Sequence, residues 1–255
     1  MTTVDERTRK RLSTGHEVAL PLELSFAMGG VTVPARRSRL EAVLPEGLSS
    51  LAIAPGIGCV ALVGIRYHRV GGGDRGGTGL EPYDEFAVIV PAVRGSRTSL
   101  PGAQLVDSEI GGYVHWLPVT TDPSIALGRE LWGFPKERAA ITVSDGPNAI
   151  RTVVDADGDR YGGGETVRLE VAHPRTGARA RDWSMASYTR NDGALLRTAA
   201  QIRGEVAIAP GPSVGTRLEV APELAAELGL WQRPLTRLYG STVRARLSEG
   251  ERVEG

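Results

Sequence analysis

Short runs of alternating apolar and polar residues, separated by glycine and proline, dominate the sequence. The chain contains 33 glycines and 16 prolines, and the runs between them are rich in valine, isoleucine and threonine. Alternation with a period of two is typical of β-strands that bury one face. The pattern predicts strands at residues 17–26, 58–70, 83–93, 112–120, 139–144, 149–156, 166–173, 182–189, 195–208, 217–220 and 235–247.

A few segments carry helix signals instead. One spans residues 36–44 and ends before Pro45, one begins with Pro123 at its first position and runs to Trp132, and one spans residues 222–228. Few short helices among many strands predict an α+β, mainly β fold, closed into a barrel or packed as two sheets. We expect a flexible segment over residues 1–16 and a single domain over residues 17–255.

The charge balance and the cysteine content indicate which partners and which compartment to expect. The chain has 30 basic and 30 acidic residues, so it has no basic footprint for nucleic acid. Its one cysteine, Cys59, lies in an apolar run and is typical of a protein from a reducing compartment. No stretch resembles a signal peptide or is long enough to span a membrane. We therefore expect a soluble cytoplasmic protein that binds neither nucleic acid nor membranes.

One lysine stands out in a chain that places its positive charge almost entirely on arginine. The chain has two lysines, Lys10 and Lys136, and 28 arginines. A lysine, unlike an arginine, can lose its proton when it is desolvated and then act as a base or nucleophile. Lys136 follows Gly133, which is suited to ending a helix, and Pro135, which fixes the backbone beside it. The pattern is consistent with a Schiff-base lysine, and equally with an ordinary surface lysine.

The segment GRELWGFPK, residues 128–136, resembles the signature of the acetoacetate decarboxylase superfamily. Further stretches follow in the order expected for that family: AVLPEGL at 42–48, YDEFAVIVP at 83–91, GGYVHW at 111–116 and GPSVGTRLEV at 211–220. The resemblance implies a single-domain barrel, a homo-oligomer and a lysine that forms an imine with a small keto acid. Such an imine is its own electron sink, so no metal or organic cofactor is expected.

The resemblance assigns the imine-forming lysine to Lys136 and the acid–base glutamate to Glu85. Strand alternation puts Glu85 on the same face as Tyr83 and Ala87. Two other charged residues of true decarboxylases have no counterpart here. The family's early arginine falls near Phe26, and its second glutamate falls within residues 60–64, VALVG, which carry no charge. Glu137 stands where those enzymes have a second lysine. Some members of the superfamily instead use the lysine for aldol condensation and dehydration of pyruvate-like 2-oxo acids.

Several further residues are candidates for substrate binding. Arg129 offers a fixed cation for a carboxylate, while Trp132 and Phe134 surround the lysine with apolar surface. The remaining candidates are polar-tipped aromatic residues and a histidine expected to line the pocket, Tyr83, Tyr113, His115 and Tyr239. The histidines have no metal-ligand spacing, so we expect no metal site.

Two alternatives to a Schiff-base enzyme stay open. A small-molecule binding barrel without catalysis would keep the fold and expose an ordinary lysine. GPSVG at 211–215 also fits the pattern of a serine hydrolase with Ser213 as nucleophile. That motif needs a helix directly after it, whereas residues 216–220 predict a strand. The favoured hypothesis is a lyase that decarboxylates a 3-oxo acid or condenses and dehydrates a 2-oxo acid.

Overall fold

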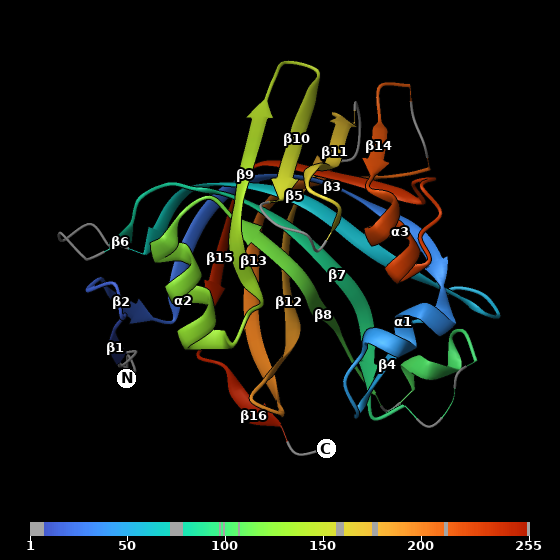
Figure 1. The fold of residues 1–255 in the computed structure, drawn as a ribbon, viewed down its shortest axis with the longest axis horizontal. Coiled ribbons are helices and arrows are strands. Elements are labelled where there is room, and N and C mark those ends of the chain that lie inside the picture. Colours follow the sequence, from blue (N-terminus) through green and yellow to red (C-terminus); the bar gives the residue numbers. More distant parts are fainter. Residues whose placement is uncertain are drawn as a thin grey trace.

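The structure is a computed structural model that describes residues 8–71, 79–96, 98, 100–106, 108–156, 161–174, 178–211 and 214–253. It is mainly β, as predicted (Figure 1). The helices are α1 (Arg37–Val43), α2 (Asp122–Trp132), α3 (Pro222–Leu228) and a short 3₁₀ helix, η1 (Ala103–Leu105). The strands are β1 (Thr8–Arg11), β2 (Glu17–Leu20), β3 (Leu22–Arg36), β4 (Leu48–Ser50), β5 (Ile57–Gly71), β6 (Gly79–Leu80), β7 (Asp84–Arg94), β8 (Glu109–Val119), β9 (Lys136–Asp145), β10 (Ala149–Ala156), β11 (Gly164–Ala172), β12 (Ala178–Asn191), β13 (Ala194–Pro210), β14 (Arg217–Val220), β15 (Thr236–Leu247) and β16 (Glu251–Val253).

A closed barrel forms the centre of the fold. Its strands pair in the order β8–β12–β13–β15–β3–β5–β7, and a further pairing of β7 with β8 closes the ring of seven. Closure removes the unpaired strand edges that an open sheet would present. From β8 the sheet continues through β9, β10, β11 and β14, which extend away from the barrel (Figure 1).

Two large apolar cores follow from this arrangement, beside a smaller cluster around Tyr188. Each barrel strand contributes to the first, which we call the inner core: its members include Phe26, Val63, Ala87, Val114, Val206 and Val243, with Trp183 packed against it. The second, the outer core, joins the other face of β3, β5, β7 and β8 to the β9–β11 extension and to α1 and α3: its members include Val31, Phe86, Trp116, Ile150 and Leu224. Alternate residues of one barrel strand therefore enter different cores.

Two glycines let the β10 strand cross closely over the barrel. Gly29 and Gly64 pair in register on β3 and β5. A Cβ on Gly64 would lie 2.8 Å from Cβ of Thr152, and one on Gly29 would lie 3.3 Å from Cβ of Ile150. Only glycine allows this approach of the two layers.

The N-terminal segment departs from the sequence prediction. We expected residues 1–16 to be flexible; residues 1–7 lie outside the described residues, and beyond them β1 pairs with β2 as an antiparallel hairpin. Leu12 is buried in the inner core, and Ser13 donates its backbone N–H to the Glu130 carboxylate of α2 at 3.1 Å. These contacts attach residues 8–13 to the rest of the fold. The strand predicted at 17–26 is divided at Pro21 into β2 and β3, and β3 runs on to Arg36.

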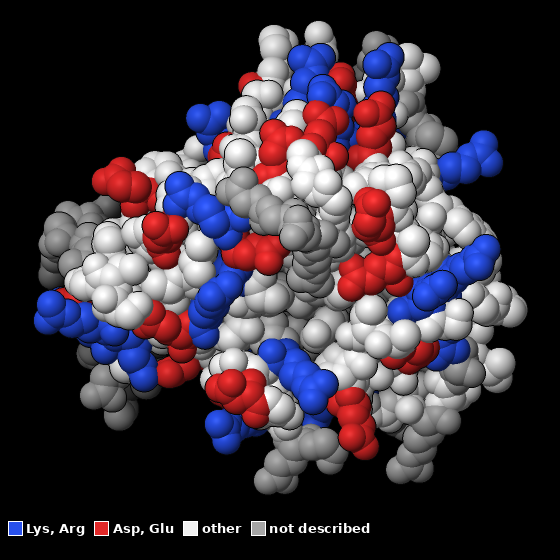
Figure 2. Space-filling model, viewed as in Figure 1, with Lys and Arg blue, Asp and Glu red and all other residues white. Residues whose placement is uncertain are grey.

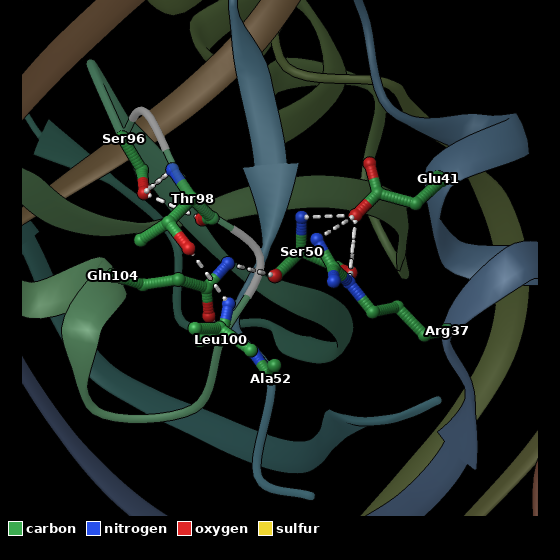
Figure 3. Close-up of polar contacts among 8 residues, drawn as sticks. All are labelled: Arg37, Glu41, Ser50, Ala52, Ser96, Thr98, Leu100 and Gln104. Carbon is green, nitrogen blue, oxygen red and sulfur yellow. Dashed lines mark hydrogen bonds and ion pairs between the residues drawn. The ribbon is translucent and has the colours of Figure 1, made fainter. Parts of the chain in front are cut away.

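A polar network joins η1, β4 and α1 to one another (Figure 3). The Gln104 side chain accepts the Ala52 N–H at 2.8 Å and donates to the Ser50 carbonyl at 3.1 Å. The Glu41 carboxylate accepts the Ser50 hydroxyl at 2.8 Å and pairs with Arg37 at 2.9 Å. Gln104 and Ser50 are both fully buried, so their hydrogen bonds satisfy groups that water does not reach.

Positive and negative side chains are interspersed over the face of the molecule seen in Figure 2. The mixture agrees with the balanced charge of the chain. In the described part of the chain, no helix is long and apolar enough to cross a membrane.

Candidate active site

The backbone around Lys136 is held by the turn that links α2 to β9. Gly133 ends the helix in the left-handed conformation, with φ 61° and ψ 20°, as its sequence position predicted. The Phe134 N–H then donates to the Gly128 carbonyl at 3.1 Å, and the Lys136 N–H donates to the Phe134 carbonyl at 2.7 Å. The Arg129 side chain donates from Nε to the Lys136 carbonyl at 2.7 Å. These bonds fix where the lysine leaves the chain.

The Lys136 side chain enters the inner core and meets Glu85 there. Its Nζ lies 2.7 Å from Oε2 of Glu85 and 3.1 Å from the Tyr83 hydroxyl. Lys136 is only 3% exposed and Glu85 only 4% exposed. A buried charged group requires a partner of opposite charge, and Lys136 and Glu85 are partners for one another. The two residues selected from the sequence thus form one buried ion pair.

Glu85 reaches the lysine across β8. Glu85 on β7 pairs with Val119 on β8, and Leu117 on β8 pairs in parallel with Lys136 on β9. Tyr83 and Ala87 both lie in the inner core, as alternation along this segment predicted.

Tyr67 completes the site, and the sequence analysis did not identify it. Its hydroxyl donates to Oε1 of Glu85 at 3.1 Å, so the carboxylate is held from both oxygens. The Tyr67 ring packs on Tyr83 at 4.6 Å and on Phe26 at 5.4 Å between centroids. In sequence Tyr67 is one aromatic residue of a predicted strand, and only the pairing of β5 with β7 brings it to Glu85.

Both tyrosines stay protonated well beyond neutral pH. Burial, reinforced by the negative charge of Glu85, raises the pKa of Tyr67 and of Tyr83 well above the ordinary tyrosine value. Each phenol therefore remains a neutral hydrogen-bonding group beside the ion pair.

Gly128 makes room for the lysine stem. A Cβ at this position of α2 would lie 2.6 Å from Cε of Lys136 and 3.0 Å from Cγ. Those distances are too short for any real side chain. The first residue of the GRELWGFPK segment thus has a steric role that its spacing alone does not reveal.

The residue after the lysine faces away from the site. Glu137 accepts a hydrogen bond from the indole of Trp116, an outer-core residue. Successive side chains of a strand point to opposite faces, so Glu137 lies on the side opposite Lys136, in agreement with the sequence analysis.

The remaining candidates divide between the two cores. Trp132 and Phe134 are buried in the inner core with Lys136, and their rings pack 5.4 Å apart. Arg129 is exposed, and its Nε is engaged by the Lys136 carbonyl, which favours positioning the lysine over binding a substrate carboxylate.

Tyr113, His115 and Tyr239 make their described contacts away from the lysine. Tyr113 and Tyr239 pack against the outer core, and Nε2 of His115 lies 3.4 Å from Glu227 on α3. The register of β7 with β8 shifts by one residue at His115, which redirects the side chains of β8. The prediction rested on unbroken alternation along this strand, which does not include such a shift.

Tyr239 belongs to a separate polar cluster. Its hydroxyl donates to Oδ2 of Asp145 at 2.9 Å, and its ring stacks on His173 at 3.8 Å. Nε2 of His173 lies 3.1 Å from Oδ1 of Asp145. Burial and the bond to Asp145 raise the pKa of Tyr239 to about 12.

The structure after the GPSVG segment does not fit the serine hydrolase alternative. Ser213 itself lies outside the described residues. The residues after GPSVG form β14, whereas a nucleophile elbow continues directly into a helix. Among the described residues, no group of histidine, cysteine, aspartate or glutamate side chains could hold a metal ion.

Comparison with known proteins agrees with this geometry. A family model described as acetoacetate decarboxylase matches residues 18–195. The chain belongs to the acetoacetate decarboxylase family. The match includes both Glu85 and Lys136. No curated protein matches the chain.

Several solved structures share the fold at low sequence identity. An acetoacetate decarboxylase from Legionella pneumophila has 17% identity and a TM-score of 0.62, with 92% of this chain and 87% of that one covered. The enduracididine biosynthesis enzyme MppR complexed with pyruvate has 14% identity and a TM-score of 0.62, with 91% and 90% covered. MppR complexed with the condensation product of pyruvate and imidazole 4-carboxaldehyde has 12% identity and a TM-score of 0.60, with 91% and 88% covered.

Proposed function

We propose that this family member is a Schiff-base lyase acting on a small keto acid, with Lys136 forming the imine and Glu85 moving protons. The observation that carries the proposal is the 2.7 Å contact between Nζ of Lys136 and Oε2 of Glu85 inside the inner core. A non-catalytic binding barrel has no need to bury its lysine, and at 3% exposure Lys136 disfavours that alternative.

In the first step the amine must become neutral. Transfer of one proton from Nζ to Oε2 of Glu85 leaves a nucleophilic amine and a carboxylic acid, with no change in net charge. The amine then attacks the keto carbon, and Glu85 returns its proton as the carbinolamine forms. Loss of water from the carbinolamine gives the iminium. The iminium nitrogen accepts the electrons released by the next bond cleavage, so this step uses no separate cofactor.

The two tyrosines support this proton transfer. Tyr83 accepts a hydrogen bond from Nζ, which orients the amine. Tyr67 donates to Oε1 of Glu85 and leaves Oε2 directed at the lysine. Because both phenols remain protonated, neither competes with Glu85 as the base.

The reaction proposed is enamine chemistry on a pyruvate-like 2-oxo acid. Where true decarboxylases carry an early arginine, this chain has Phe26, whose ring packs against Tyr67 beside the ion pair. Phe26 supplies no charge at the position where those enzymes carry the arginine. The fold is shared with MppR, whose structures contain pyruvate and a pyruvate condensation product. Decarboxylation of a 3-oxo acid is the competing outcome.

Borohydride reduction of the protein with a panel of 2-oxo and 3-oxo acids tests the proposal. A trapped imine adds the mass of the keto acid less one oxygen atom. Proton exchange at the methyl group of pyruvate in heavy water then reports enamine formation. Failure of every keto acid to give an adduct rejects Schiff-base chemistry. Carbon dioxide release from acetoacetate without pyruvate exchange assigns the decarboxylase reaction instead.

A further inference from the structure

A row of arginines crosses the outer face of the barrel wall. Arg244 and Arg246 flank Ala245, an inner-core residue, so their side chains project outward from β15. Arg203 on β13 pairs directly with Arg244, which pairs in turn with Ser25 on β3. Arg69 on β5 pairs with Ser25 and continues the row.

These residues line a hollow of about 320 Å³. Its wall contains four arginines and a single carboxylate, Glu23; the lining is Glu23, Leu24, Arg69, Gln201, Arg203, Arg244, Ala245 and Arg246. The chain as a whole has equal numbers of basic and acidic residues, so the hollow is a local departure from charge balance.

The arrangement brings like charges close together, and their repulsion destabilises the fold. Like charges directly opposite each other on neighbouring strands destabilise a sheet, and Arg203 and Arg244 are such a pair. Asp182 contacts Arg203 at 2.9 Å and offsets part of that charge. Among the described residues, Arg244 and Arg69 have no acidic side chain within salt-bridge distance. A bound anion would relieve the repulsion that remains.

We propose that this hollow binds a small molecule carrying two or more adjacent phosphate groups. Guanidinium groups bind phosphate through paired, charge-assisted hydrogen bonds. The row from Arg203 to Arg69 crosses three strand spacings, or about 14 Å, which suits several linked anionic groups better than one. The hollow faces away from the Lys136 site, so it is separate from the proposed catalytic chemistry.

An adjoining hollow indicates the rest of the ligand. It shares Gln201 and Arg246 with the first, has a volume of about 200 Å³, and is otherwise lined by small residues, Pro21, Ser184, Ala199, Ala200 and Ser248. A small uncharged portion linked to the phosphates fits this lining of apolar and hydroxyl-bearing residues.

Calorimetric titration of the full chain with inorganic triphosphate tests the site, with inorganic phosphate and sulfate compared at matched ionic strength. We expect triphosphate to bind at least about tenfold more tightly than either, because only triphosphate reaches several arginines. Arg244→Gln and Arg69→Gln should each weaken binding about tenfold, whereas Arg217→Gln, on exposed β14, should leave it unchanged.

A second measurement uses thermal melting without ligand. Arg244→Gln removes the repulsion with Arg203, so the variant should melt at a higher temperature than the parent and lose the stabilisation by triphosphate. Absence of triphosphate binding by the parent overturns the proposal, as does an equal loss in Arg217→Gln. Binding to vesicles of anionic phospholipid without binding to triphosphate also overturns it, because the partner would then be a membrane surface.

Discussion

Gly128 and Lys136 touch across the turn between α2 and β9, and a Cβ on the glycine would lie 2.6 Å from Cε of the lysine. Gly128→Ala should therefore displace the lysine from Glu85 and slow imine trapping, although alanine is the better helix former by about 1 kcal/mol. The rate of imine trapping measures the displacement of the lysine, and thermal melting measures the change in stability. Ala126→Gly is the control, because it weakens the same helix while Gly128 still leaves room for the lysine. Equal trapping by Gly128→Ala and the parent would contradict the steric role.

Lys136→Arg should abolish trapping with every keto acid while the fold is kept. Arginine retains a positive charge beside Glu85 but cannot lose its proton to become a nucleophile. Intact mass after borohydride reduction measures the effect. Lys10 is the only other lysine and pairs at the surface with Glu249 at 2.9 Å, so Lys10→Arg is the matched control and should trap normally. An adduct on the Lys136 variant would assign the chemistry elsewhere.

Glu85→Gln should lower turnover by about 10²- to 10⁴-fold, the usual contribution of a positioned acid or base. Glutamine keeps the shape but cannot take the proton from Nζ. Steady-state kinetics of pyruvate methyl exchange measures the loss. Glu81→Gln, an exposed change just before β7, should leave the rate unaltered. A Glu85 variant with normal exchange would exclude Glu85 as the proton carrier.

The raised pKa values of Tyr67 and Tyr83 predict a loss of stability at high pH. Above about pH 10 the unfolded chain ionises these phenols while the folded protein keeps them protonated. The folded state then binds more protons, so the free energy of unfolding falls as pH rises, by about 1.4 kcal/mol per pH unit for each tyrosine. Below about pH 9 the free energy should not respond to these groups.

Urea unfolding between about pH 8 and pH 11, which spans the ordinary tyrosine pKa, checks this behaviour. Tyr67→Phe and Tyr83→Phe should each make the decline shallower. A decline of the same slope in both variants would assign it to other groups.

Tyr239→Phe should destabilise the fold by about 1 kcal/mol, the net contribution of one hydrogen bond, without changing turnover. Its hydroxyl bonds to Asp145 in a cluster separate from the lysine. Thermal melting and pyruvate exchange rates separate the two effects. Lost activity at unchanged stability would restore Tyr239 to the active site.

Local sequence patterns predicted the class of fold and the helix α2, through strand alternation, a proline that starts the helix and a glycine that ends it. Lys136 stood out as one of two lysines among 28 arginines, whereas the resemblance to the acetoacetate decarboxylase family selected Glu85. Alternation was also enough to place Glu85 with Tyr83, because residues two apart on a strand share a face.

Only the tertiary structure decided which distant groups meet. Glu85 and Lys136 are 51 positions apart, and Tyr67 reaches Glu85 through the pairing of β5 with β7. The extra residue at His115 puts Tyr113 on the outer face although Leu117 lies in the inner core, because a bulge changes the face on which residues before it lie relative to residues after it. Local sequence patterns specify which residues of one strand share a face. Strand pairing and bulges specify which faces of different strands meet, and these depend on contacts between residues far apart in the chain.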